Sequence, residues 1–276
     1  KIELSSFWRL IHPKLTPVQN FVFKNKIEKN FNIVISCGRK SVIPSIFLKR
    51  KFKNKIMNIH IQDPKVSLSN FDFIVAPEHD QIRGPNVLRT KGAIHYLRNE
   101  ELKENENYLK KRISKEKIVS MIVGGPNKYY DYNEELIDEI FKKIYNNFIK
   151  KGYQLIFIPS LRTPSKTIEK AQKFFSSDEI IINNVDKKAY LCALKLAKYI
   201  IVTCDSTSMI SEAAMTGKPI YVAQMKPIRQ NKRFKSFFKL FKSLNIIKDF
   251  DNTIEDWHYE RLNETDKISS YIKDQI

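Results

Sequence analysis

Short apolar runs recur along the chain, and they constrain its fold more than any other feature of the sequence. Most are rich in Ile and Val without strict alternation of apolar and polar residues, which is typical of strands buried on both faces of a parallel sheet. Helical patterns lie between them, so strand and helix alternate, and the sequence predicts an α/β fold. The predicted strands are residues 32–36, 56–61, 71–76, 117–123, 154–159, 179–182, 199–203 and 219–223, and the predicted helices are residues 41–51, 133–151, 167–175, 187–198 and 206–216.

Length and one charged stretch predict how this α/β chain is divided. The chain has 276 residues, and because domains hold roughly 150 residues each, two are expected. The charged, apolar-poor stretch 98–116 marks the predicted boundary. We therefore predict a Rossmann-like N-terminal domain over residues 1–115 and a Rossmann-like, nucleotide-binding C-terminal domain over residues 116–250. A helix within residues 251–276 is expected to pack back toward the first domain.

The two halves differ in completeness. The second half matches a complete doubly wound unit, whereas the first lacks an opening strand and helix, either natively or through truncation. The three cysteines are few and unclustered, so we predict neither a disulfide framework nor a metal site, and a reducing compartment. No stretch approaches the ~18 to 20 apolar residues of a membrane span, and no export signal is present. We expect a cytoplasmic protein, either free or peripheral on the inner face of the membrane.

The charge balance indicates an anionic partner. Lys and Arg number 49 against 30 Asp and Glu, a formal net charge of +19, which fits nucleic acid, a membrane surface or a phosphorylated metabolite. Nucleic acid is disfavoured, because no recognised nucleic-acid-binding module appears. In the helical stretch 231–244, four phenylalanines share one face with basic residues around them. This stripe either lies on an anionic membrane or packs on the second sheet with only its lysines in water.

The clearest chemical motif follows the predicted strand 199–203. Asp205, Ser206 and Ser208 are short polar residues that can cap the next helix, whose free amides and dipole favour a bound phosphate. Glu212 lies one helical turn beyond Ser208, where a carboxylate can accept both hydroxyls of a ribose. The alternative is that Ser206 is only a helix cap and Glu212 a first-turn acid, and spacing alone leaves both open.

Two further loops follow strands at the same predicted sheet edge, where open α/β sheets bind ligands. The glycines of the first, residues 124–128, allow close approach of a ligand, and its lysine can meet a phosphate. The arginine of the second, residues 160–164, can fork onto a diphosphate. The alternative for the first loop is that it is only a tight turn, and the alternative for the second is that its arginine only faces solvent. The predicted nucleotide- and phosphate-binding residues are thus Gly124, Gly125, Asn127, Lys128, Arg162, Thr163, Asp205, Ser206, Ser208 and Glu212.

Three polar loops follow strands in the first half. One combines Glu78, His79 and Asp80, two acids and an imidazole, which suit proton transfer near neutral pH. We predict that these three are the catalytic residues, with a capped turn as the alternative. The other two loops supply the predicted first-domain cleft residues Gly38, Arg39, Gln62 and Asp63. His60 and His95 are expected to be structural.

Taken in order, these motifs resemble one family, the mitochondrial fission proteins of the elongated-mitochondria type, which has many bacterial members. The resemblance runs from about residue 30 to the C-terminus. This chain departs from the family pattern at residues 188–190, which read Lys-Ala-Tyr in place of Asn-Pro-Tyr, and at Leu161, where a second arginine is usual. The matching pieces are the segments at residues 37–41, 59–64, 71–80, 84–87, 92–93, 124–128, 162–164 and 205–212, together with Trp257 and residues 263–265.

The resemblance implies a fold like that of GT-B glycosyltransferases and nucleotide-sugar epimerases, with two Rossmann-like domains facing each other across a cleft. It also implies two functions. The first is binding of a nucleotide-diphosphate sugar by an enzyme, either a glycosyltransferase that transfers the sugar at the membrane surface or an enzyme like the nucleotide-sugar epimerases. The second is the family's role in plants, a membrane-associated adaptor that recruits a partner protein. Enzyme and adaptor both stay open, and the residues do not identify the sugar, the base or the acceptor. No cofactor beyond the nucleotide sugar is expected.

Overall fold

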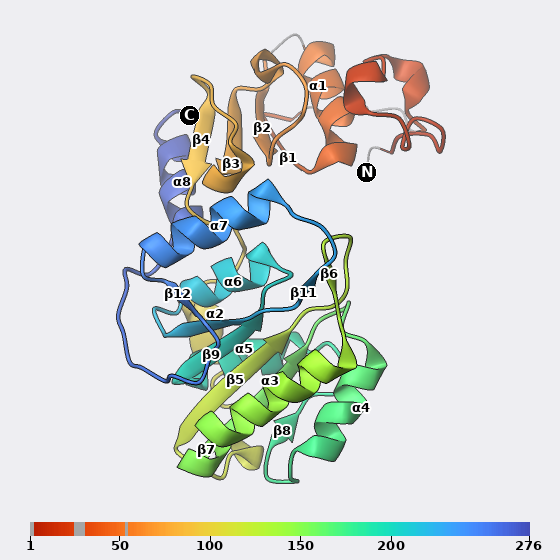
Figure 1. The fold of residues 1–276 in the computed structure, drawn as a ribbon. Helices are drawn as coiled ribbons and strands as arrows, with labels where there is room; N and C mark the ends of the chain where they lie inside the picture. Colours follow the sequence, from red (N-terminus) through yellow and green to blue (C-terminus); the bar gives the residue numbers. More distant parts are fainter. Residues whose placement is uncertain (1–2, 25–30, 53–54) are drawn as a thin grey trace. The chain divides into compact units, whose positions relative to one another are not determined.

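The structure of the chain is a computed structural model that describes residues 3–24, 31–52 and 55–276. It separates into two compact units (Figure 1). Unit 1 consists of Lys1–Lys91 with Asp266–Ile276, and unit 2 consists of Gly92–Thr265. Each unit is built around its own parallel sheet.

Unit 1 contains four parallel strands in sequence order, with β1 at one edge. The strand β3 is also covered by the C-terminal helix α8 (Glu264–Lys273), whose Tyr271 ring lies 6.1 Å from that of Phe73. At the edge strand, Ile35 is 67 % exposed. The elements of unit 1 are β1 (Ile33–Cys37), β2 (Met57–Ile61), β3 (Phe73–Pro77), β4 (Val87–Thr90), helix α1 (Val42–Lys51), and the 3-10 helices η1 (Pro13–Leu15), η2 (Asn20–Val22), η3 (Arg39–Ser41), η4 (Leu68–Asn70) and η5 (Glu78–Asp80).

A buried polar chain links β1, β2 and α1 in unit 1. The Ser36 hydroxyl lies 2.8 Å from Nδ1 of His60 and donates to the Ser45 hydroxyl at 3.1 Å. Burial lowers the pKa of His60 to about 4, so the imidazole is neutral at physiological pH. His60 therefore has the structural role that the sequence predicts.

Unit 2 contains a six-stranded parallel sheet in the order β12-β10-β9-β5-β7-β8. Its first strand β5 is central, with β7 on one side and β9 on the other. The elements of unit 2 are β5 (Lys117–Val123), β6 (Tyr130–Asp131), β7 (Tyr153–Pro159), β8 (Ile180–Ile181), β9 (Tyr199–Thr203), β10 (Ile220–Ala223), β11 (Lys226–Pro227), β12 (Ile247–Asp249), helices α2 (Asn99–Glu104), α3 (Glu134–Asn147), α4 (Ser165–Phe174), α5 (Lys187–Leu196), α6 (Thr207–Ala214) and α7 (Lys232–Ser243), and the 3-10 helices η6 (Lys110–Arg112) and η7 (Ile149–Lys151).

The sheet of unit 2 is buried on both faces, as its apolar runs predict. Side chains alternate along β5, so Ile118 packs with α5 on one face while Val119 and Met121 pack with α3 on the other. Helices α3 and α5 begin at Asn133 and Asp186, whose side chains accept hydrogen bonds from the first-turn amides. The sheet is therefore covered by helices fixed at their N-termini.

The unit boundary differs from the sequence prediction. The chain passes from unit 1 to unit 2 at residues 91/92, not at 115/116, and returns at 265/266, not at 250/251. The charged stretch was misjudged because its few apolar residues are anchors: Leu97, Leu102 and Leu109 are all buried in the cores of unit 2. The charged stretch therefore belongs to unit 2, where it forms α2, η6 and the turns between them.

The phenylalanine stripe lies on α7 and packs inward. Phe237 and Phe241 are fully buried in the main core of unit 2. Phe234 and Phe238 are half-buried, and the Phe234 ring lies 5.2 Å from that of Tyr130. Of the two alternatives, the packed stripe is therefore the one seen. Among the described residues, no helix is long and apolar enough to cross a bilayer.

Candidate functional site

A cavity of about 470 Å³ lies at the carboxyl ends of β5, β7 and β9 in unit 2, and we call it the edge cavity. The chain leaves β5 toward β7 and later returns to β9 on the other side, so this edge is the switch point at which open α/β sheets bind ligands. Apolar side chains, including Ile122 and Met209, form much of its wall. Its polar and charged lining residues are Tyr96, Ser160, Arg162, Asp186, Lys187, Tyr190, Ser206 and Glu212.

Asp205 organises this edge from inside. Its side chain is fully buried. One carboxylate oxygen accepts hydrogen bonds from the hydroxyls of Tyr132, at 2.6 Å, and Thr203, at 2.7 Å. The other accepts from the amide of Gly125, at 3.1 Å, and from Nη2 of Arg162, at 2.7 Å. With both oxygens engaged, Asp205 positions the loops around the cavity instead of facing a ligand.

The pKa of Tyr132 reflects the same arrangement. Burial, and next the neighbouring carboxylate of Asp205, raise the pKa of the Tyr132 hydroxyl well above its usual value. The phenol therefore keeps its proton and serves as a permanent donor to Asp205. Nothing in the sequence pattern pointed to Tyr132, which stands nine residues beyond the end of the predicted strand 117–123.

Gly124 and Gly125 are required by close approach within the chain. A Cβ atom on Gly124 would lie 2.1 Å from a carboxylate oxygen of Asp205, and one on Gly125 would lie 1.8 Å from the backbone oxygen of Arg162. No side chain fits at either position. The groups that approach these glycines are thus Asp205 and Arg162 of the protein itself, where the sequence prediction had placed a ligand.

Arg162 is held at the cavity wall by two donors. Nη1 donates to the carbonyl of Gly125 at 3.1 Å, and Nη2 to Asp205. The side chain remains 41 % exposed and lines the edge cavity. A guanidinium has five N–H donors, so a positioned and exposed Arg162 keeps others for an anion.

The other residues of the two predicted loops hold the loops themselves. The Thr163 hydroxyl donates toward the carbonyls of Val123, at 2.7 Å, and Gly124, at 2.8 Å, which ties the β7 loop to the end of β5. Asn127 closes the turn after the glycines through its side chain. The Lys128 ammonium lies 4.8 Å from the centre of the Tyr129 ring and is not part of the cavity wall.

Helix α6 presents its N-terminus to the edge cavity. The Ser206 hydroxyl accepts from the amide of Met209 at 3.3 Å, so Ser206 is the helix cap, and it also lines the cavity. Ser208 is exposed and is not part of the cavity lining. The sequence prediction placed Ser208 and Glu212 together on the ligand-facing side of this helix. In the structure, Met209 and Glu212 are the residues of α6 that line the edge cavity.

Glu212 is joined to Tyr190 of α5 at the inner side of the edge cavity. The Tyr190 hydroxyl donates to a carboxylate oxygen of Glu212 at 2.5 Å, and both residues line the cavity. Burial raises the pKa of Glu212, and the Tyr190 hydrogen bond opposes that rise. Burial and the Glu212 carboxylate raise the pKa of Tyr190 in turn, so the phenol stays protonated. Tyr190 thus orients the carboxylate and leaves its other oxygen for a ligand.

The predicted catalytic cluster lies in unit 1, in the 3-10 helix η5 at the end of β3. The side chain of His79 is fully buried and lies 3.9 Å from Asp80, whose side chain is 9 % exposed. Glu78 is half-exposed and pairs with Arg89 at 3.3 Å. In this structure Glu78 meets solvent, the Asp80 side chain is nearly buried, and the imidazole of His79 is fully buried.

The first-domain cleft residues follow β1 and β2 at the carboxyl edge of the same sheet. Gly38 adopts φ 74°, which favours glycine, and Gln62 also has a positive φ, 82°. Arg39 donates to the carbonyl of Leu10 at 3.3 Å. Asp63 pairs with Lys65 and accepts from its amide. Parallel pairing of β1, β2 and β3 brings these loops and η5 to one edge of unit 1.

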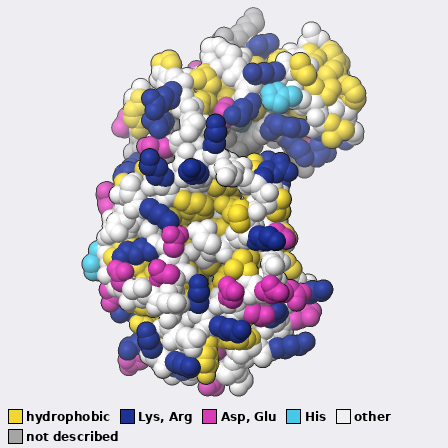
Figure 2. Space-filling view, viewed as in Figure 1, with side chains coloured by type: hydrophobic (Ala, Val, Ile, Leu, Met, Phe, Trp, Pro, Cys, Tyr) yellow, Lys and Arg dark blue, Asp and Glu magenta, His cyan; other side chains and the backbone are white. Residues whose placement is uncertain are grey.

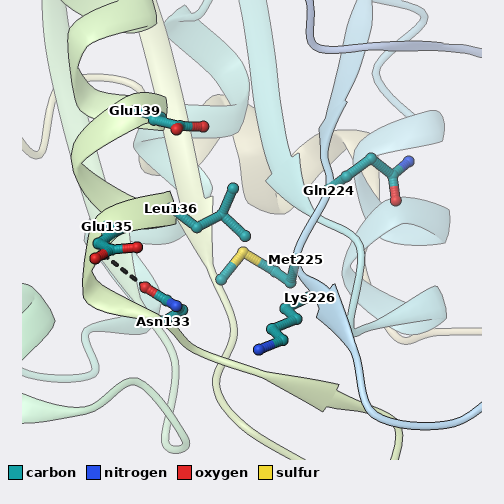
Figure 3. A pocket seen from close by; sticks show the side chains of 7 residues that line it. All are labelled: Asn133, Glu135, Leu136, Glu139, Gln224, Met225 and Lys226. Carbon is teal, nitrogen blue, oxygen red and sulfur yellow. Dashed lines mark hydrogen bonds between the residues drawn. The ribbon is translucent and has the colours of Figure 1, made fainter.

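A second cavity, of about 410 Å³, lies beside the end of β10 and contains no predicted site residue. In Figure 3, Leu136 and Met225 point toward each other across it, with Glu135 and Glu139 of α3 on one side and Lys226 on the other. The dashed line is the cap at the start of α3, where Asn133 accepts from the Glu135 amide at 2.7 Å. Within the described part of the chain, no three His, Cys, Asp or Glu residues gather as a metal site.

Comparisons with known proteins give the family and the fold. The sequence model of the family described as mitochondrial fission ELM1 matches residues 1–276. An uncharacterised protein, RP120, of Rickettsia prowazekii is 28 % identical over 88 % of this chain and 79 % of its own length. Mitochondrial fission protein ELM1 of Arabidopsis thaliana is 24 % identical over 88 % of this chain, which spans only 64 % of that protein.

Among solved structures, UDP-GlcNAc 2-epimerase of Methanocaldococcus jannaschii matches with a TM-score of 0.50 and 12 % identity, over 88 % of this chain and 77 % of the epimerase. At that identity the match shows the fold alone. The α/β class with two Rossmann-like domains of the GT-B type is confirmed.

Proposed function

The chain belongs to the mitochondrial fission ELM1 family, and on that premise we propose that unit 2 binds the ribose and diphosphate of a nucleotide sugar in the edge cavity. One observation carries the proposal. A held arginine, a capped helix N-terminus and a half-buried, oriented carboxylate line a single apolar-walled cavity at the switch point of a parallel sheet. This combination of apolar walls and a few convergent polar groups is typical of ligand sites.

Each polar group has a separate task in this proposal. Arg162 and the free amides at the start of α6 bind the diphosphate, which carries the negative charge that a guanidinium and a helix dipole favour. Glu212 accepts the ribose hydroxyls with the oxygen that Tyr190 does not use. The apolar wall at Ile122 and Ile158 accommodates the base. The fold neighbour is named for its action on UDP-GlcNAc, so that nucleotide sugar is the first ligand to test.

A thermal-shift screen of the full chain against nucleotide sugars, free nucleoside diphosphates and nucleosides tests the proposal. A ligand at a hundredfold excess over its Kd stabilises by about 2.7 kcal/mol, which raises the Tm of a domain of this size by about 5 °C or more. We expect such a shift from nucleoside diphosphates and their sugars but not from nucleosides. Arg162→Gln should remove the advantage of the diphosphates. No shift from any nucleotide would contradict the proposal.

The finer proposal is an enzyme that transfers the sugar to an acceptor at the membrane surface, with an acid of η5 as the proton-transfer group. Because the Asp80 side chain keeps a small exposed fraction, 9 %, and that of His79 keeps none, Asp80 is the stronger candidate base, and His79 would orient it. Once turnover is detected, Asp80→Asn should reduce it by about 100-fold with nucleotide affinity nearly unchanged. Full turnover in Asp80→Asn would remove the cluster from the mechanism.

An adaptor that recruits a partner at a membrane is the second candidate, and one observation favours it. The segment before β1 exposes large apolar side chains, which gather in the upper right of Figure 2 over the N-terminal part of unit 1. The contributing residues are Phe7, Leu10, Leu15 and Phe21. An adaptor should keep its partner binding when Arg162 and Glu212 are replaced, whereas an enzyme should lose its activity.

A further inference from the structure

We propose that unit 2 has a second ligand site, at the opposite edge of its sheet from the edge cavity, that binds the phosphate group of a phosphorylated small molecule. The site is a cavity of about 400 Å³, which we call the basic cavity. It lies between α2, the end of α5 and the turn before β10, so it adjoins the amino ends of β9 and β10. Lys103, Lys195, Lys218 and Arg261 line it.

Lys218 is the fixed point of the basic cavity. Its ammonium donates to the carbonyl of Leu194, at 2.9 Å, and to that of Lys195, both at the C-terminus of α5. These contacts hold the ammonium at one place, and an ammonium has three donors. Through the described part of the chain, no carboxylate forms an ion pair with Lys218. A positioned cation with an unused donor therefore faces the cavity.

Two further cations surround Lys218. Arg261 packs against the turn at Gly217, which has a φ of 72°. A Cβ atom on Gly217 would lie 2.8 Å from Cγ of Arg261. Lys195 has only a distant pairing with Glu106, at 3.9 Å. Burial, then the charges of Lys195 and Arg261, lower the pKa of Lys218 to about 8. The folded chain thus holds three cations together at an electrostatic cost, which a bound anion would offset.

The groups at the basic cavity indicate the class of ligand. A phosphate dianion matches the ammonium and guanidinium groups that line this one cavity, and Arg261 can meet it through two donors at once. The cavity is larger than one phosphate needs, and Asn99 and Glu100 on α2 supply polar groups for the rest of a small phosphate ester. The basic cavity and the edge cavity have no lining residue in common, so this site does not depend on the proposed function.

The experiment is calorimetric titration of the full chain with pyrophosphate. An Arg162→Gln background removes the arginine of the edge cavity and so weakens binding there, and the part of the signal that variants of the basic cavity change is assigned to the basic cavity. In that background, Lys218→Met and Arg261→Gln should each raise the Kd by about tenfold or more, which corresponds to the loss of one charge-assisted hydrogen bond. Lys142→Met is the matched control, because Lys142 is exposed on α3 and far from this cavity in sequence. It should leave the Kd unchanged.

Two outcomes would overturn the proposal. One is equal pyrophosphate affinity in Arg261→Gln and Lys142→Met, since Arg261→Gln leaves the Lys218 contacts to α5 in place. The other is retention of full affinity in Lys218→Met, which would leave Lys218 as a cap of α5 only. Sedimentation with phosphatidic acid vesicles distinguishes the source of the phosphate. A soluble ester predicts that Lys218→Met and Lys142→Met sediment alike, and selective loss with Lys218→Met would overturn the soluble ligand in favour of a lipid headgroup.

Discussion

Glu212 is the residue whose environment departs most from what a surface helix offers. Glu212 is half-buried, its carboxylate accepts a hydrogen bond from the Tyr190 hydroxyl, and burial raises its pKa above the ordinary 4.5. Between 4.5 and that raised value the folded chain holds a proton that the unfolded chain has lost, so stability falls as pH rises through this window. Above it, the folded state carries the cost of a buried charge.

The first prediction follows from this sign. Glu212→Gln, which keeps the shape and an acceptor for Tyr190, should have a higher Tm than the wild type at pH 7, and the difference should narrow as the pH falls toward 4. Melting curves across this range measure it. Glu139→Gln, on the exposed face of α3, is the control and should show no such trend. A Glu212→Gln variant less stable than wild type at pH 7 would show that the charged carboxylate stabilises the site.

The second prediction concerns Gly125. In Gly125→Ala the new Cβ would overlap the backbone oxygen of Arg162, so the loop must move and the contacts of Asp205 must change. We expect a loss of about 3 kcal/mol, in the range of a broken buried ion pair, measured by denaturant unfolding. The matched control is Gly152→Ala, where the φ is 84° but nothing lies within 4 Å, so only the cost of left-handed backbone, about 1 kcal/mol, should appear. Equal losses would contradict the close approach as the reason for Gly125.

Residue-level prediction from the sequence was partial, for a physical reason. Arg162 and Ser206 could be placed because each follows a recognisable strand, and Glu212 because helical spacing relates it to the start of α6; the structure brings all three to one cavity. The roles of Asp205 and the two glycines could not, since they depend on atoms about 80 residues apart in the chain. The only indication of Tyr190 in the sequence is that it matches the tyrosine of the family's Asn-Pro-Tyr segment at residues 188–190.

At the scale of elements, α7 shows what a helical pattern leaves undecided. Four phenylalanines on one face predict an apolar stripe, but the same stripe suits a membrane and a protein core. In unit 2 the core takes it, because Phe237 and Phe241 are fully buried. The lysines of the opposite face are exposed to water. Binding to an anionic membrane therefore remains a prediction, now through the charges of these lysines and not through the phenylalanines.

The third prediction separates these two faces of α7. Phe237→Ala should destabilise unit 2 by about 3 to 5 kcal/mol, as deletion of a buried phenylalanine does. Lys235→Gln with Lys239→Gln should leave stability nearly unchanged and weaken binding to anionic vesicles by about 1 kcal/mol per engaged cation. Co-sedimentation at low salt with anionic and neutral vesicles measures it. Equal sedimentation with both vesicle types would show that the excess charge serves solubility alone.

At the scale of the whole molecule, the sequence predicts the α/β fold but not the position of the boundary between the two units. Buried strands between helices give period and composition signals strong enough to predict two parallel sheets. The boundary between the units depends on which side Leu97, Leu102 and Leu109 pack, and a charged stretch hides that choice. The burial of His79 could not be predicted either, because it is a property of the folded unit and not of the residues next to His79 in the sequence.

The central claim is that unit 2 binds a nucleotide through the edge cavity, and one measurement tests it most directly. The measurement is isothermal titration of the full chain with the nucleotide sugar that gives the largest thermal shift. Glu212→Ala should weaken the binding free energy by about 1 to 3 kcal/mol, the scale of a lost charged hydrogen bond, and so raise the Kd. Ser208→Ala lies on the same helix but outside the cavity lining, so its Kd should equal that of the wild type. Equal affinities in wild type and Glu212→Ala, or a loss in Ser208→Ala as large as in Glu212→Ala, would contradict the account.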